Sequence, residues 1–89
     1  MAYETSTTSA FRNQYNKVDR RLRRIVDDAV EIIKEFPTDY QHKITYISKR
    51  KEGGLYRFRV PGCHIFYILP EKETEKPNTI ILTAVKPLR

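Results

Sequence analysis

The stretch LYRFRVPGCHIFYIL, residues 55–69, decides how this chain folds. Its first part alternates between apolar and basic residues, with a period of two. The alternation sends three side chains to one side and two to the other: Tyr56, Phe58 and Val60 against Arg57 and Arg59. Because successive residues of a strand point to opposite faces of a sheet, this pattern predicts a strand with one buried face and one wet face.

The second part of the stretch predicts the partner of that strand. Pro61 and Gly62 are typical of a tight turn, and residues 64–69 are apolar and aromatic enough for another strand. The two strands should therefore pair antiparallel. If the hairpin closes with a two-residue loop, His64 points to the same face as Arg57 or Arg59.

Two helices are expected upstream of the hairpin. Ser9 is a plausible N-cap for the first, which carries apolar residues at helical spacing: Ala10, Phe11, Tyr15 and Val18. Asp19 is a plausible N-cap for a longer helix that Pro37 ends. Its apolar stripe is the clearest periodic signal of the chain: Leu22, Ile25, Val26, Ala29, Ile32, Ile33 and Phe36.

Two further strands are predicted at residues 44–47 and 79–85, with the loop 70–78 before the last one. Residues 3–8 fit equally well a weak edge strand or a disordered lead-in. The expected fold is an α+β domain in which two N-terminal helices pack on one face of a three- to four-stranded, mainly antiparallel sheet. The other face of the sheet is then free to bind.

The composition limits the classes of function. The 89 residues predict a single domain, 1–89, too small for an enclosed cofactor cavity. Seventeen Lys and Arg against eleven Asp and Glu give a net charge of +6, which favours a polyanionic or acidic partner. One cysteine allows no intramolecular disulfide, and with two histidines the ligands for a structural zinc site are too few. We expect a cytoplasmic protein with no membrane span, metal or cofactor.

The exposed side of the central hairpin holds the best candidates for chemistry. Arg57 and Arg59 could bind phosphate and stabilise a pentacoordinate phosphorus transition state. His64 could abstract a 2′-OH proton or protonate a leaving 5′-oxygen. The loop Lys49–Lys51 lies just upstream, and Lys86 and Arg89 lie downstream, so one concave basic patch is predicted.

A structural interpretation stands beside each of these. The arginines fit an ordinary solvated sheet face about equally well, and a lone histidine is more often structural than catalytic. We interpret Cys63 as a small filler and His42 as a connector residue. Four tyrosines are candidates for stacking on bases or for the core, namely Tyr40, Tyr46, Tyr56 and Tyr67, and we favour the core for the last two.

The arrangement resembles the RelE/ParE superfamily of toxins. The similarity rests on FRNQYNKV (residues 11–18), on the long helix that ends at Pro37, and on the strands GLYRFRV (54–60) and HIFYI (64–68). It covers nearly the whole chain and is most specific in the two strands. The resemblance implies a toxin neutralised by a cognate antitoxin, either a ribosome-dependent mRNA endonuclease of the RelE type or a gyrase poison of the ParE type.

By this resemblance, Arg57 and Arg59 match the two basic strand residues that contribute to catalysis in RelE-type enzymes. At the start of the next strand the family has a catalytic arginine, where this chain has His64. Near its end the family has another arginine and often a tyrosine, for which only Lys86 or Arg89 could substitute. We therefore expect catalysis by Arg57, Arg59, His64 and Lys86, with a weakened or inactive antitoxin-binding homologue, or a ParE-like gyrase poison, as the alternatives.

The remaining basic residues are expected to dock on ribosomal RNA. They fall in three places, the start of the long helix, the loop before the hairpin and the last residue: Arg20, Arg21, Arg23 and Arg24; Lys49, Arg50 and Lys51; Arg89. Basic residues at a helix N-terminus oppose the helix dipole, which suggests a purpose other than helix stability. The predicted partners are thus an antitoxin, the ribosome and mRNA.

Overall fold

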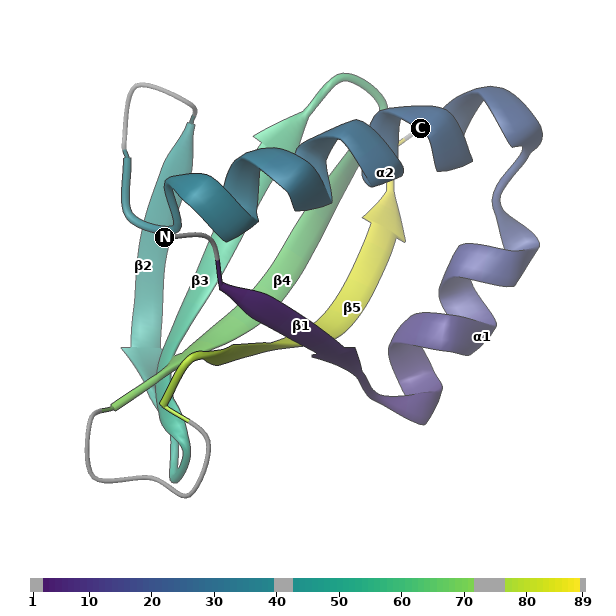
Figure 1. Ribbon diagram of the computed structural model, residues 1–89. Coiled ribbons are helices and arrows are strands. Elements are labelled where there is room, and N and C mark those ends of the chain that lie inside the picture. The colour runs from purple at the N-terminus through teal and green to yellow at the C-terminus, as the bar shows by residue number, and fades with distance from the viewer. Residues whose placement is uncertain (1–2, 40–42, 72–76, 89) are drawn as a thin grey trace.

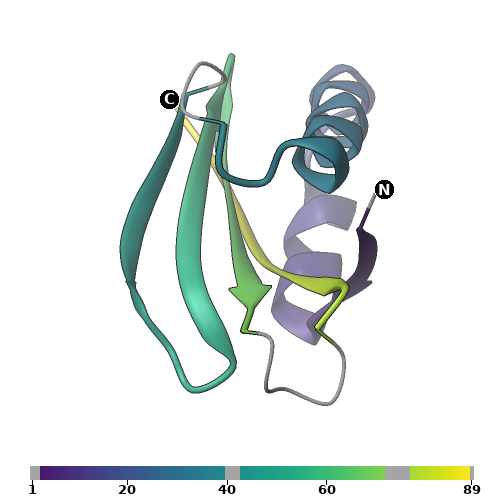
Figure 2. The same cartoon turned by 60° about the vertical axis from the view of Figure 1, so that its left-hand side comes forward.

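The computed structural model describes residues 3–39, 43–71 and 77–88, and these form two helices and five strands (Figure 1). In chain order the elements are β1 (Glu4–Thr7), α1 (Ser9–Lys17), α2 (Arg20–Glu35), β2 (Ile44–Lys49), β3 (Gly53–Val60), β4 (Cys63–Pro70) and β5 (Thr79–Pro87). The predicted α+β class is confirmed, and both helices lie on one side of the sheet (Figure 2). No helix within the described residues has the length and apolar character needed to cross a membrane.

The sheet has the order β1-β5-β4-β3-β2, so it holds one strand more than the upper bound predicted. The additional strand is β1, which pairs parallel with β5 from Glu4 opposite Thr79 to Thr7 opposite Leu82. Of the two interpretations left open for this segment, the edge strand is therefore correct. All other pairings are antiparallel.

The caps of the helices follow the sequence with one difference. Asp19 caps α2 as predicted, and its carboxylate accepts a 2.8 Å hydrogen bond from the Leu22 amide. The N-cap of α1 is Thr8 and not Ser9, because the Thr8 hydroxyl accepts from the Phe11 amide at 3.1 Å. The same hydroxyl lies 3.1 Å from the Thr83 carbonyl and donates to it, which ties the start of α1 to β5.

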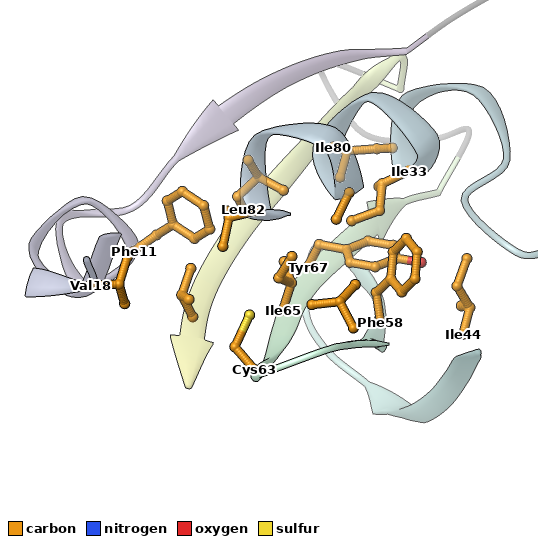
Figure 3. Packing of buried hydrophobic residues seen from close by; sticks show 14 residues of the cluster. Phe11, Val18, Ile33, Ile44, Phe58, Cys63, Ile65, Tyr67, Ile80 and Leu82 are labelled. Carbon is orange, nitrogen blue, oxygen red and sulfur yellow. The ribbon is translucent and has the colours of Figure 1, made fainter. Parts of the chain in front are cut away.

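The core lies between the helices and the inner face of the sheet (Figure 3). Fully buried side chains come from α2, β4 and β5: Val26, Ile33, Cys63, Ile65, Tyr67, Ile80 and Val85. The Tyr67 hydroxyl donates a 2.6 Å hydrogen bond to the Pro37 carbonyl, which satisfies a polar group that burial would otherwise penalise. Phe36, predicted on the apolar stripe of α2, is instead 51 % exposed, because it is the C-cap residue and its φ of −136° departs from the helix.

The outer face of the sheet carries a small apolar group of its own. Leu55 on β3 and Ile68 on β4 are direct partners and are buried to 9 % and 8 % exposure, although neither belongs to the core cluster. Ile68 is in turn the partner of Ile81 on β5. The outer face is therefore apolar toward the β2–β3 turn, and its opposite end is where the predicted site residues lie.

Candidate functional site

Three charged or titratable residues form a row across the outer face, near the β3–β4 turn. The turn at Pro61 and Gly62 has two residues, as predicted, so that Arg59 on β3 is the direct partner of His64 on β4. His64 is also the direct partner of Lys86 on β5. Directly opposed residues in antiparallel strands have Cβ atoms about 5 Å apart, so the imidazole lies between two cationic side chains.

A second row lies one step further along the strands. Its members are Thr45 on β2, Arg57 on β3, Phe66 on β4 and Ala84 on β5, each opposite the next. Arg57 is half-buried, and its Nε is buried without a hydrogen-bond partner among the described residues. Because a buried N–H is costly to leave unpaired, this guanidinium is suited to an acceptor brought by a ligand.

Within the described residues, the cations of the site are not paired with acidic side chains. No ion pair between described residues involves Arg57, Arg59, His64 or Lys86. The pKa of His64 is lowered from its ordinary value of 6.5, first by desolvation and then by the charges of Arg57 and Arg59. The imidazole is therefore neutral at pH 7 and can accept a proton.

The charged end of the outer face continues around the edge of the sheet. A hollow of about 480 Å³ next to Arg59 is lined by Lys43, Val60, Pro61, Gly62 and Leu88 as well. A second hollow of about 360 Å³ shares the turn and Leu88 and extends to Arg21 and Leu22 of α2. The start of α2 and the Arg59 row thus lie at the same end of the molecule, on either side of the β3–β4 turn.

The arginines at the start of α2 divide into two groups. Arg20, Arg21 and Arg24 are exposed and available to an anionic partner. Arg23 is half-buried, its Nε has no hydrogen-bond partner among the described residues, and its charge acts on the Tyr15 hydroxyl of α1. Arg23 therefore faces the junction of the two helices, unlike the other three.

The basic loop Lys49–Lys51 does not join the Arg59 row, so the single concave patch predicted from sequence is wrong in its geometry. Lys49 is the partner of Gly54, five residues along β3 from Arg59. At about 3.4 Å per residue the loop is roughly 17 Å from that row. Lys49 also forms a 3.4 Å ion pair with Glu71.

Other predicted candidates have structural positions. Cys63 is fully buried, and burial raises the pKa of its thiol, as expected for a filler. Tyr67 is in the core as predicted, and Tyr56 is half-buried and stacked on it at 5.7 Å. Tyr46 is 48 % exposed at the sheet edge, with its ring edge-on to Tyr56. Arg89, His42 and Tyr40 lie outside the described residues.

Two residues of this region were missed from the sequence. Lys43 lies beside Arg59, whose amide donates to the Lys43 carbonyl at 3.0 Å, and its position depends on a backbone φ of +66° that composition does not reveal. Phe66 belongs to the second row, edge-on to His64 with 6.5 Å between ring centroids. The alternation of β4 already placed Phe66 on the outer face, and this signal could have identified it.

The arrangement can bind phosphate and support acid–base chemistry. Arg57, Arg59 and Lys86 supply fixed positive charge, and His64 supplies a neutral imidazole within the same few ångströms of sheet. Charge-assisted hydrogen bonds from guanidinium groups are among the strongest that a phosphate can accept. The neutral imidazole provides the base that such a site needs.

Solved structures of known proteins share this fold, although no family model and no curated protein sequence matches the chain. The RelE–RelB complex of Pyrococcus horikoshii contains a chain that superposes with a TM-score of 0.78 at 16 % identity, covering 98 % of this chain and 96 % of that one. The RelBE2 toxin–antitoxin complex of Mycobacterium tuberculosis contains a chain that superposes with a TM-score of 0.74 at 16 % identity, covering 99 % of this chain and 100 % of that one. The isolated RelE toxin of E. coli superposes with a TM-score of 0.74 at 11 % identity, and the match covers 99 % of this chain and 86 % of that one. The chain therefore has the RelE fold.

Proposed function

We propose that this chain is the toxin of a toxin–antitoxin system and acts as a ribosome-dependent mRNA endonuclease. The observation that carries the proposal is the Arg59–His64–Lys86 row, with Arg57 beside it, on a sheet face that no described helix covers (Figure 2). The RelE fold supports the same proposal, because the solved structures that share it include the isolated RelE toxin of E. coli and a toxin–antitoxin complex.

Cleavage uses the 2′-OH of the mRNA as the nucleophile, so the reaction needs neither a metal ion nor a cofactor. His64 accepts the 2′-OH proton, and the 2′-oxygen forms a bond to phosphorus. Arg57 and Arg59 stabilise the negative charge of the pentacoordinate phosphorus. The bond to the 5′-oxygen breaks, the leaving oxygen takes a proton from Lys86, and a 2′,3′-cyclic phosphate and a 5′-hydroxyl result.

Docking on the ribosome is assigned to basic residues outside the catalytic rows. The three exposed arginines at the start of α2 lie at the same end of the molecule as His64, namely Arg20, Arg21 and Arg24. The loop Lys49–Lys51 supplies a second, separate contact. Binding to ribosomal RNA through such residues weakens steeply as the salt concentration rises.

The proposed physiological partner is a cognate antitoxin in the cytoplasm. Among the structures that share the fold, one from P. horikoshii is a RelE–RelB complex, and one from M. tuberculosis is the RelBE2 toxin–antitoxin complex. A net charge of +6 favours an acidic partner, which would screen the same cations that bind RNA.

A non-cleaving binding module is the second candidate, and one observation favours it. His64 occupies the position where the RelE pattern has an arginine, and its lowered pKa leaves it neutral at pH 7. The site then has one cation fewer for the transition state. With this weaker site, the protein would be a homologue that only binds an antitoxin, or a ParE-like gyrase poison.

Mapping of 5′ ends on a reporter mRNA in a translation extract tests the proposal. Purified protein should create new ends within codons only when ribosomes are present, and Arg57→Ala should abolish them. Arg12→Ala is a matched control, because it removes an exposed arginine of α1 that lies outside both rows and outside the residues assigned to docking. If no new ends form at an excess of protein over ribosomes, the nuclease proposal is wrong, and gyrase inhibition becomes the assay of choice.

A further inference from the structure

We propose that Phe66 is a base-stacking platform, so that an unpaired base of single-stranded RNA lies on its ring while Arg57 and Arg59 hold the adjacent phosphates. This inference rests on the proposed function, since it names how the same face positions its RNA. It assigns a task to a residue that the catalytic chemistry does not use.

The neighbour of Phe66 on β5 is a small residue. In its row Phe66 lies between Arg57 and Ala84, and the methyl group of Ala84 is too short to cover the ring. Phe66 is half-buried and does not belong to the core cluster. An aromatic side chain left partly exposed among cations gives up burial energy, which is typical of sheet faces that stack bases.

The spacing of the face suits a nucleotide. Arg57 is the direct cross-strand neighbour of Phe66, about 5 Å away between Cβ atoms, and long side chains easily span the distance from a base to its own phosphate. Arg59 lies two residues beyond Arg57 on β3, roughly 7 Å from it along the strand. The next phosphate of an extended RNA chain can reach it there.

His64 completes a corner around the proposed base. Its ring lies at 77° to that of Phe66, with centroids 6.5 Å apart, so a base stacked on Phe66 meets the imidazole at its edge. This places the ribose of the same nucleotide near the group proposed to accept its 2′-OH proton. The buried apolar pair Leu55 and Ile68 lies next along the same face, on the side of Phe66 away from His64.

The buried, unpartnered Nε of Arg57 is a second and independent indication of a ligand on this row. Among the described residues it has no acceptor, although the atom is removed from solvent. A phosphate oxygen of a strand stacked on Phe66 would supply one. The aromatic ring and the unpaired donor are thus direct neighbours that one nucleotide can engage together.

Fluorescence anisotropy with two labelled probes tests the platform without ribosomes. One probe is a short oligoadenylate, and the other is a strand with the same number of phosphates and no bases. Phe66→Leu should weaken binding of oligoadenylate about tenfold and leave binding of the abasic strand unchanged, since one stacked base is lost. Phe66→Tyr keeps the ring and should bind both probes as the unsubstituted protein does.

Ile68→Val is the matched control, because it changes packing on the same strand and face without touching an aromatic ring. Equal weakening for both probes with Phe66→Leu, or no weakening at all, would overturn the platform. The ribosome assay separates the two proposals. A base-dependent loss of binding without any cleavage by the unsubstituted protein keeps the platform and rejects the nuclease, whereas cleavage with unchanged rate and position in Phe66→Leu rejects the platform alone.

Discussion

The two faces of the central hairpin carry opposite chemistry on the same strands. On the inner face Phe58, Ile65 and Tyr67 are exposed by only 4 %, 0 % and 0 %. On the outer face the alternate positions hold Arg59 and His64, which are direct partners and remain accessible. The inner face therefore supplies stability through apolar burial, and the charged end of the outer face supplies little of it.

The outer face also works against stability at its charged end. Like charges on neighbouring strands repel, and here Arg59 and Lys86 lie on either side of His64 without an acid of the described chain to offset them. The depressed pKa of His64 is a direct consequence of desolvation and of the nearby guanidinium groups. An anionic ligand, as proposed above, would offset this repulsion.

The largest expected effect comes from the same substitution on opposite faces of β4. Ile65→Ala should lower the free energy of unfolding by about 4 kcal/mol, because Ile65 is fully buried between the sheet and the helices. Ile68→Ala should lower it by about 2 kcal/mol, because Ile68 packs only within the small outer group. Urea unfolding of both variants measures the difference, and equal losses would contradict the division into two faces.

The next effect should appear in activity and not in stability. Arg57→Ala and Arg59→Ala should each reduce ribosome-dependent cleavage by up to about 10³-fold, since each removes a positive charge from the transition state. Arg59→Ala should shift the free energy of unfolding by no more than about 0.5 kcal/mol, because Arg59 is exposed and takes part in no ion pair between described residues. Arg57→Ala should shift it by no more than about 1 kcal/mol, because this half-buried side chain also has no such ion pair and its Nε has no hydrogen-bond partner there. Loss of cleavage that merely follows loss of folded protein would show that these arginines are structural.

A smaller, pH-dependent effect should come from His64. Its pKa lies below the ordinary value, and the neutral form is the one that accepts a proton, so cleavage should rise with pH up to that pKa and level off above it. His64→Gln should lower the plateau about 10²-fold and remove the rise. The ratio of the two rates at each pH cancels the response of the ribosome itself, and a ratio that does not change with pH would rule out His64 as the base.

Much of the fold could be predicted because its signals are local. The period of two in residues 55–60, the turn at Pro61 and Gly62, and the capped apolar stripe of α2 each report on neighbours in sequence. The sequence could not decide between a strand and a disordered lead-in for β1. Its four residues form a strand only by pairing with β5, which follows more than seventy residues later. Thr8 was missed as the cap for a similar reason, since its hydroxyl also bonds to β5.

The candidate site was predictable where register follows from a turn, and not elsewhere. A two-residue hairpin loop sets His64 opposite Arg59, and the sequence had predicted that His64 shares a face with Arg57 or Arg59. The loop Lys49–Lys51 is close to Arg57 in sequence, but each strand residue adds about 3.4 Å of length. The loop therefore lies at the end of the sheet opposite the β3–β4 turn. The position of Arg23 at the junction of the helices depends on how α1 and α2 pack, which helical periodicity does not determine.

The smallest expected effect distinguishes the two basic regions proposed to dock on ribosomal RNA. Arg21 is exposed on the side of the β3–β4 turn, near the Arg59–His64–Lys86 row, so Arg21→Ala should reduce the slope of log affinity against log salt by about 1. Lys49 is already paired with Glu71 at the other end, so Lys49→Ala should change the slope less. Co-sedimentation with ribosomes over a salt series measures both. Equal losses would mean that RNA contacts both ends of the molecule alike, whereas a loss confined to Arg21 would assign docking to the end that holds His64.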